Sequence, residues 1–511
     1  MNSRPENNVT QSGGSAAGPA DFDLIEATVE DVHAAMGKGR LTARRLTEMY
    51  LARIDAYDKA GPALNAVILV NPEALQIADD LDAKFRTSGP VGPLHGIPVL
   101  LKDNVNTAGM ATTGGSLSLA GYVPPEDAEI VGKLKDAGAI VIAKTNLHEF
   151  AVWGETVSSL GGRTHNPYDL SRTPGGSSGG TGAALAANFG LLGIGTDTVN
   201  SIRSPASANS LVGIRPTVGA VSRRGIIPNS FVQDSVGPMA RTVTDAARML
   251  GVLTGYDAGD PATSWSIGRT ESDYTRFLDH GGLKGARIGV VEGFFGKDDV
   301  HGEVNAVIRE AIARMEQAGA VTVSVDDPIF DTSWLLAEVT VHPYELKADL
   351  NSYLSNPAAG TPVKSIEEII ASGKFHPNIV EEIEQAQDLS KDSPDYRGRL
   401  VKRMRIRDRL MQIMAENRLD ALAYPHQARL VVPIGDRQVD RNGALGSIAG
   451  FPAITVPGGF SPASDAAPVG VPVGLEFLGR PWSEPALVRI AFGFEQATLF
   501  RRPPRSVPPL S

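Results

Sequence analysis

The sequence contains no cysteine, and this absence removes several kinds of chemistry at once. A disulfide framework, a thiolate nucleophile and a metal or cluster held by cysteine are all excluded. A chain without disulfides fits the reducing interior of a cell, so we predict a cytoplasmic location.

Long apolar runs and an excess of positive charge are also missing. No stretch approaches the roughly 18 apolar residues of a transmembrane helix, and residues 1–20 lack the pattern of a signal peptide. Lys and Arg total 48 against 58 Asp and Glu, and a net charge of −10 does not favour binding to nucleic acid or an anionic membrane. We predict a small-molecule substrate, no nucleic-acid or membrane partner, a monomer or homodimer, and a disordered tail over residues 1–20.

Glycine is abundant, and the stretch Thr173–Ala208 places it around two groups of serines. The first group lies in Gly175–Gly180, and Gly/Ser-rich tracts of this kind are usually flexible linkers. Here, however, small apolar residues follow without a break. They predict a helix over 181–189 and a buried strand over 191–195. We therefore expect the glycines to be buried.

The second group centres on Ser201. Pro205 is tolerated only in the first turn of a helix, so a new helix is expected to begin just after Ser201. That would place Ser201 on a strand-to-helix turn, beside unpaired amide N–H groups that can bind an anion. Such a turn suits a nucleophile with an oxyanion hole.

A third polar position stands at the end of an apolar run. Lys102 follows Ile97–Leu101, and most lysines in this setting extend to solvent. A lysine acts as a base only when it is neutral, which requires burial or nearby positive charge to lower its pKa from about 10.4. The apolar run would supply that burial.

Together these motifs resemble the signature of the amidase signature family, serine hydrolases with a Ser-Ser-Lys triad. The resemblance is carried by Gly175–Gly182, by Gly195–Thr198 and by Ser201-Ile202-Arg203, and it continues through Leu211–Thr217 and Asp234–Arg241. The 24-residue spacing from Ser177 to Ser201 fits the family, and Lys102, 75 residues before Ser177, occupies the position of its lysine. In the family the peptide bond that matches Gly176–Ser177 is cis.

The resemblance implies a role for each of these residues. Ser201 would be the nucleophile, Ser177 the proton relay and Lys102 the base, with no metal and no cofactor. The family usually has two glycines where Val199 and Asn200 stand. The implied oxyanion donors are the backbone N–H groups of Thr198, Val199, Asn200 and Ser201. The implied supporting residues are Ser178, Asp197 and Arg203, and those near the substrate are Gly114, Gly115 and Ser116.

Alternating helix and strand patterns elsewhere predict an α/β fold. A helix over 127–138 precedes a strand over 139–144, and a helix over 303–318 precedes a strand over 320–325. With the resemblance, we expect a large mixed, mostly parallel β-sheet with helices on both faces. Residues 21–511 would form one amidase domain, with 328–396 a helical insertion near the site.

Three other functions are compatible with parts of the pattern. Gly176–Gly180 also matches the G-x-S-x-G nucleophile elbow, which would make Ser178 the nucleophile of an α/β-hydrolase, but it needs a preceding strand and a later histidine. The resemblance also covers the glutamine-hydrolysing subunit of a tRNA-dependent amidotransferase, and a catalytically silent binding protein. We favour an enzyme that cleaves a linear amide, or a carbamate, other than a backbone peptide bond.

Overall fold

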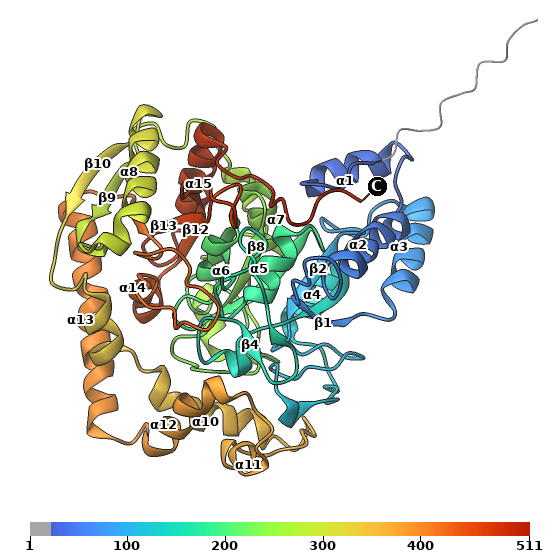
Figure 1. Ribbon diagram of the computed structural model, residues 1–511, viewed down its shortest axis with the longest axis horizontal. Coiled ribbons are helices and arrows are strands. Elements are labelled where there is room, and N and C mark those ends of the chain that lie inside the picture. The colour runs from blue at the N-terminus through green and yellow to red at the C-terminus, as the bar shows by residue number, and fades with distance from the viewer. Residues whose placement is uncertain (1–21, 511) are drawn as a thin grey trace, which may run out of the picture.

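The computed structural model describes residues 22–510, so the predicted tail over residues 1–20 lies outside the described residues. Its centre is an 11-stranded sheet in the order β1-β3-β2-β6-β8-β7-β12-β13-β11-β9-β10 (Figure 1). The strands of this sheet are β1 (Val67–Val70), β2 (Pro98–Lys102), β3 (Ile140–Thr145), β6 (Leu192–Asp197), β7 (Val212–Arg215), β8 (Ser235–Ala240), β9 (Arg287–Val291), β10 (Val321–Val325), β11 (Ala421–Pro425), β12 (Ala453–Phe460) and β13 (Pro472–Leu478). A separate hairpin pairs β4 (Val157–Ser158) with β5 (Gly162–Arg163).

The mixed α/β sheet is confirmed, but the expected predominance of parallel strands is wrong. Parallel pairing joins β2 to β3 and β6, and β9 to β10 and β11, whereas the other neighbours are antiparallel. The two helix-then-strand patterns in the sequence both form parallel pairs, because a helix carries the chain back to the same end of the sheet. The central strands β7 and β8, and β12 and β13, are instead joined by loops and therefore run in opposite directions.

Helices cover both faces of the sheet. Gly474 of β13 faces Ser207 of α6, whereas Gly459, which pairs with the neighbouring Val473, faces Val307 of α8. Helices α5 and α6 pack together on the first face, and α15 packs against α7 and α8 on the second. The helices are α1 (Val29–Gly37), α2 (Ala43–Tyr57), α3 (Ala74–Ser88), α4 (Glu129–Asp136), α5 (Gly179–Ala186), α6 (Arg203–Ala208), α7 (Val243–Leu253), α8 (Gly302–Gln317), α9 (Thr332–Trp334), α10 (His342–Leu354), α11 (Ile366–Ser372), α12 (Val380–Asp388), α13 (Pro394–Glu416), α14 (Ala444–Ala449) and α15 (Glu484–Thr498).

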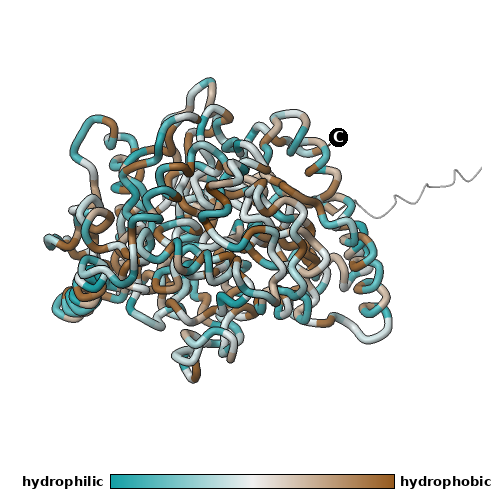
Figure 2. The backbone as a smooth tube through the Cα atoms, turned by 90° about the horizontal axis from the view of Figure 1, so that it is seen from below, coloured by the Kyte–Doolittle hydropathy of each residue, from teal (hydrophilic) through white to brown (hydrophobic). Residues whose placement is uncertain are grey.

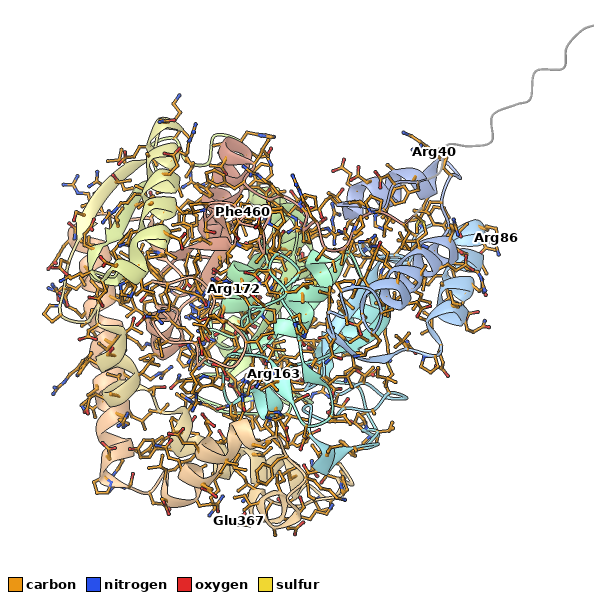
Figure 3. All side chains as sticks on the ribbon, viewed as in Figure 1. Arg40, Arg86, Arg163, Arg172, Glu367 and Phe460 are labelled. Atoms are coloured by element: carbon orange, nitrogen blue, oxygen red, sulfur yellow. The ribbon has the colours of Figure 1, made fainter. Side chains whose placement is uncertain are left out.

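The segment 328–396 contains α9 to α12 and the first residues of α13. In Figure 1 helices α10, α11 and α12 lie together beyond the lower edge of the sheet, and Figure 3 labels Glu367 of α11 at the bottom of the molecule. Their buried residues, among them Leu350, Ile369 and Ile383, form one apolar cluster with Phe150 and Ile227. This packing attaches the helical segment to loops that follow β3 and β7.

Hydrophobic and hydrophilic residues alternate along the outer helices (Figure 2), as expected of helices with one buried face. Between Phe22 and Leu510 no helix combines the length and apolar character needed to cross a membrane. The same residues include no cluster of three or more His, Asp or Glu side chains arranged to hold a metal ion.

Candidate active site

The serine loop, residues 174–178, joins the hairpin region to α5 and packs tightly against two other segments. A Cβ atom on Gly176 would lie 2.8 Å from the carbonyl carbon of Gly154, and one on Gly175 would lie 2.9 Å from the carbonyl oxygen of Ser204. Gly175 also has a φ of +71°. Larger residues would therefore clash, which explains the glycines physically. The Gly176–Ser177 peptide bond is cis, as the resemblance implies.

Lys102 ends β2 and lies beside this loop. Its Nζ is 2.7 Å from the Oγ of Ser177 and 2.7 Å from the Oγ1 of Thr196, which also accepts a hydrogen bond from Asn104 at 3.1 Å. The lysine is completely buried. Burial lowers its pKa to about 7, although Asp197 and Asp234 partly oppose this shift. Much of the amine is thus neutral near physiological pH and can accept a proton.

Ser201 lies on the turn between β6 and α6, where the sequence places it. Its carbonyl oxygen accepts a hydrogen bond from the N–H of Ser178 at 3.2 Å, which ties the two serine groups together. Among the hydrogen bonds of residues 22–510, none joins the hydroxyls of Ser177 and Ser201. The Ser178 hydroxyl lies 3.3 Å from the carbonyl oxygen of Thr196, so it braces the loop against β6.

The turn from Thr198 to Ser201 leaves its amide groups available. In the part of the chain that the structure describes, none of these four N–H groups donates a hydrogen bond within the protein. Neither Val199 nor Asn200 has a positive φ, so the turn forms without the two glycines usual in the family. Asn200 packs against Gly443, where an added Cβ would lie 2.8 Å from the Asn200 Cβ.

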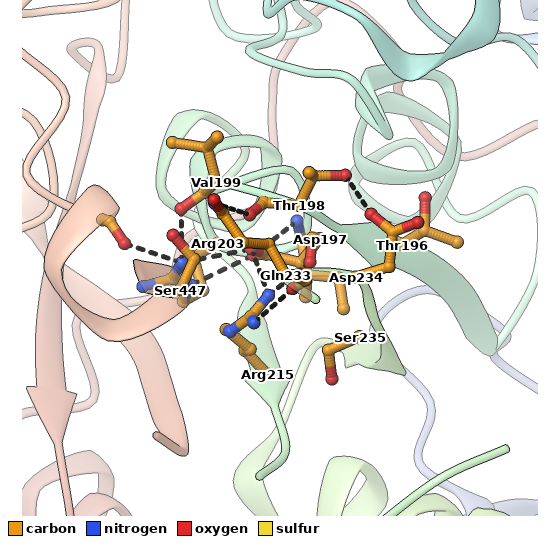
Figure 4. Close-up of polar contacts among 12 residues, drawn as sticks. Thr196, Asp197, Thr198, Val199, Arg203, Arg215, Gln233, Asp234, Ser235 and Ser447 are labelled. Carbon is orange, nitrogen blue, oxygen red and sulfur yellow. Dashed lines mark hydrogen bonds and ion pairs between the residues drawn. The ribbon is translucent and has the colours of Figure 1, made fainter. Parts of the chain in front are cut away.

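A buried ionic network holds this turn in place (Figure 4). Arg203 donates from Nε to Asp197 at 3.0 Å and from Nη2 to the Val199 carbonyl at 2.7 Å, and it also pairs with Glu476. Arg215 lies 2.9 Å from the other Asp197 oxygen. Burial alone would raise the pKa of Asp197, but Arg203 and Arg215 lower it well below its usual range. The carboxylate is therefore ionised and anchors the turn.

We expect Arg203→Met to lower the free energy of unfolding by about 3–5 kcal/mol. The substitution removes the cation that pairs with the buried carboxylates of Asp197 and Glu476. Urea unfolding followed by tryptophan fluorescence measures this change. The control is Arg314→Met, which removes an exposed pair with Glu310 and should cost less than about 1 kcal/mol. Equal losses in the two variants would contradict a structural role for the network.

Ser201 opens onto a cavity of about 450 Å³. Thr198, Val199 and Asn200 line it beside Ser201, while Lys102 and Ser177 lie behind this wall. The structure does not bring Gly114, Gly115 and Ser116 to the wall. Gly114 packs instead against Phe150, next to the wall residue Ala151. Most of the opposite wall comes from the 328–396 segment: Ser333, Leu336, Ala337, Thr340, His342, Pro343, Tyr344, Leu346, Glu382, Gln385 and Leu389.

Several site residues have no clear signal in the sequence. Thr196, which hydrogen-bonds to Lys102, stands inside the Gly195–Thr198 motif, and that motif is the only signal that could have found it. By contrast, Trp153, His342 and Arg441 reach the cavity from three distant segments. Neither hydrophobic periodicity nor a short motif marks them.

The nucleophile-elbow alternative does not agree with the geometry. Residues 171–176 form no strand apart from an isolated bridge at Arg172, whereas the elbow needs a strand directly before its serine. Within residues 22–510 no histidine ring hydrogen-bonds to Ser178. Ser178 therefore lacks the setting of an α/β-hydrolase nucleophile.

Comparison with known proteins decides the family. A sequence model of the amidase family matches residues 45–488. The chain is a member of the amidase signature family. As an amidase, it is a hydrolase that acts on the C–N bonds of amides. This establishes, over residues 45–488, the family that the glycine and serine motifs resemble.

The amidase is also similar to individual proteins over nearly its full length. It is 37% identical to a probable amidase of Arabidopsis thaliana over 95% of this chain and 93% of that protein. It is 34% identical to a glutamyl-tRNA(Gln) amidotransferase subunit of Moorella thermoacetica, covering 94% and 98%. The structure of native peptide amidase from Stenotrophomonas maltophilia superposes with a TM-score of 0.84 and 41% identity, covering 94% and 98%.

Proposed function

We propose that this amidase hydrolyses linear carboxylic amides through an acyl-enzyme on Ser201, with Lys102 as the base and Ser177 as the relay between them. The main support is the position of the buried Lys102 amine, 2.7 Å from the Ser177 hydroxyl, directly behind the turn that carries Ser201 on the cavity wall. A serine hydroxyl is a weak nucleophile unless a neighbouring base takes its proton.

In the proposed reaction Ser201 Oγ attacks the amide carbonyl as its proton passes to Ser177 and the Ser177 proton passes to Lys102. This step requires the Ser201 side chain to turn toward Ser177 when substrate binds. The resulting ammonium then returns a proton by the same route to the departing nitrogen, because an amide anion is a very poor leaving group. Water, activated by the same base, hydrolyses the acyl-enzyme and restores Ser201.

The negative oxygen of the tetrahedral intermediate would lie among the N–H groups of residues 198–201. These four residues line the cavity, and their N–H groups have no protein acceptor within the described part of the chain. One oxyanion donor commonly stabilises the transition state by about 2.7–4 kcal/mol. In this proposal Asp197, Arg203 and Ser178 hold the turn and do not touch the substrate.

The proposed substrate is the terminal amide of an N-acylated amino acid or of a peptide. The similarity to a peptide amidase supports this class, and so do the many apolar wall residues, among them Leu336, Leu346 and Leu389, which suit an acyl part with a side chain. Aryl amides, alkyl amides and carbamates are the other classes to compare. We also propose that residues 21–511 form one domain with 328–396 as an insertion over the site, acting in the cytoplasm as a monomer or homodimer.

Two measurements test this function. The first compares the release of ammonia or amine from amidated peptides, aryl amides, alkyl amides and carbamates. The peptide amides should have the highest kcat/KM. In parallel, a fluorophosphonate probe should label the protein at Ser201, as shown by peptide mass mapping. Failure of both measurements would overturn the proposal, and would favour a silent binding protein.

The pH dependence follows from the pKa of Lys102. Because only the neutral amine accepts a proton, kcat/KM should rise with pH through the lysine pKa of about 7 and level off above it. Stopped assays from pH 5 to 10 on two amides with different leaving groups measure this profile. The rise should have the same midpoint for both, since it belongs to the free enzyme. A profile that is flat from pH 6 to 9 would exclude Lys102 as the base.

A second candidate is the glutamine-hydrolysing component of an amidotransferase, which the similarity to the Moorella protein favours. The acidic charge and the Val199-Asn200 pair count against it. Copurification with a second protein chain, or ammonia release that depends on tRNA, would select this function over the first.

A further inference from the structure

Arg441 reaches the cavity wall from the loop between β11 and α14, and its guanidinium has a fixed position. The group lies over the ring of Trp153, 4.7 Å from the ring centroid, and Trp153 is itself held by a 2.7 Å hydrogen bond to Glu155. Gly154 makes room for it, because a Cβ there would lie 2.3 Å from Nη1. Gly154 also contacts Gly176 of the serine loop, so the guanidinium is close to the proposed reaction centre.

Within residues 22–510 this guanidinium forms no close ion pair, although Glu155 and Glu382 are near enough to attract it. Arg441 is only 7% exposed, yet among residues 22–510 no carboxylate oxygen lies within 4.0 Å of its nitrogens, and they donate no hydrogen bond. Other buried arginines pair with carboxylates, namely Arg203, Arg215 and Arg223, or donate to backbone carbonyls, namely Arg53 and Arg241. A buried guanidinium without acceptors is costly, so the cavity offers an unsatisfied cationic site.

The other ionisable groups of the wall each have at least one protein partner among the described residues, although one oxygen of Glu382 has none. Arg399 pairs with Asp395 and donates to the carbonyls of Ala337 and Thr340. Glu382, a wall carboxylate, pairs with Arg437. His342 is neutral near pH 7, because burial lowers its pKa to about 4. Among the described wall residues, Arg441 therefore carries the charge that has no ion-pair partner and is available to a substrate.

We propose that Arg441 determines the specificity of the amidase by binding a carboxylate on the acyl part of the substrate. The planar guanidinium presents paired N–H groups that match the two oxygens of a carboxylate. An uncharged acyl group would leave these donors without an anionic partner. This inference rests on the proposed function, since it assumes that the acyl part occupies the cavity beside Ser201. The carboxylate could belong to an acidic amino acid amide or to a short half-amide of a dicarboxylic acid.

Two pairs of substrates separate these sources. N-acetylglutamic acid α-amide is compared with N-acetylmethionine amide, and succinamate with pentanamide, by kcat/KM on the wild-type enzyme. We expect the anionic member of at least one pair to be preferred about 10- to 100-fold, the range of a charge-assisted hydrogen bond. The pair that shows the preference identifies the source of the carboxylate.

Arg441→Gln should lower kcat/KM for the preferred anionic substrate about 10- to 100-fold and change that for its neutral partner less than about threefold. Arg441→Lys should restore part of the preference, because lysine keeps the positive charge but lacks the paired N–H groups of the guanidinium. The matched control is Arg399→Gln, which also alters a wall arginine but one that is already paired. Its ratio of anionic to neutral kcat/KM should remain that of the wild type.

Equal losses on both members of a pair would overturn the specificity role, and so would a wild-type preference for the neutral substrates. If the wild-type enzyme turns over none of these substrates, the result counts instead against the proposed function. In that case calorimetric titration with succinate and N-acetylglutamate still tests the site. Wild-type binding that Arg441→Gln weakens at least about tenfold supports the inference, and equal affinity in the two proteins overturns it.

Discussion

Ser201→Ala is expected to lower kcat about 10⁵- to 10⁶-fold, the loss typical when a serine hydrolase is deprived of its nucleophile. The alanine removes the one hydroxyl of the proposed triad that reaches the cavity wall. The turn itself should persist, because the Asp197–Arg203 pair and the hydrogen bond from Ser178 to the Ser201 carbonyl do not involve the side chain. Initial rates of ammonia release over a range of enzyme concentrations measure the effect.

The matched control for this variant is Ser178→Ala. Ser178 carries a fully buried hydroxyl in the neighbouring serine group, where it contacts Thr196. Its loss should weaken the loop and lower kcat by no more than about 100-fold, the upper end for losing a hydrogen bond that supports a reactive group. The opposite order, with Ser178→Ala inactive and Ser201→Ala active, would assign the nucleophile to Ser178.

Lys102→Met should lower kcat/KM about 10⁴-fold, because it removes the proposed base from both serines. Methionine has a similar length and suits a completely buried position, so the folded state should be retained. Lys102→Arg should be equally inactive, since arginine stays charged at every working pH. Steady-state kinetics with the best amide of the panel, together with the thermal unfolding temperature, separate lost catalysis from lost structure.

The pH profile supplies an independent control for Lys102. Any activity that remains in Lys102→Met should no longer rise through pH 7, because the titrating amine is absent. A rise that survives the substitution would show that another group governs the wild-type profile. Lys102→Arg with wild-type activity would also contradict the mechanism, whatever the behaviour of the methionine variant.

The sequence predicts those helices and strands that a short pattern of neighbouring residues marks. The small apolar residues before and within β6 mark α5 and β6, Pro205 marks the start of α6, and the run that ends at Lys102 is β2. The helix-and-strand patterns over 127–144 and 303–325 likewise predict two parallel pairs. The antiparallel pairing at the centre of the sheet could not be predicted in this way. Strand order there depends on the paths of long loops, and hydrophobic periodicity carries no information about those paths.

The proposed triad residues could be selected because each stands in a short motif that the family shares. The walls of the cavity could not be selected in this way. Trp153, His342 and Arg441 are separated by about one hundred residues or more. The packing of α10 and α12 against the loops after β3 and β7 brings the first two to the cavity, and Arg441 reaches it from the loop between β11 and α14. Side chains that meet through long-range packing leave no spacing rule in the sequence.

The position of Lys102 behind the cavity wall has a chemical consequence. An amine is a better acceptor of acyl groups than water, so a lysine open to the cavity could capture the acyl group of the proposed acyl-enzyme and form a stable amide, which would inactivate the enzyme permanently. Here Nζ is completely buried and faces Ser177 and Thr196. In the proposed mechanism protons reach this nitrogen along a hydroxyl, but a bulky electrophile cannot, and so the arrangement would protect the enzyme from acylating its proposed base.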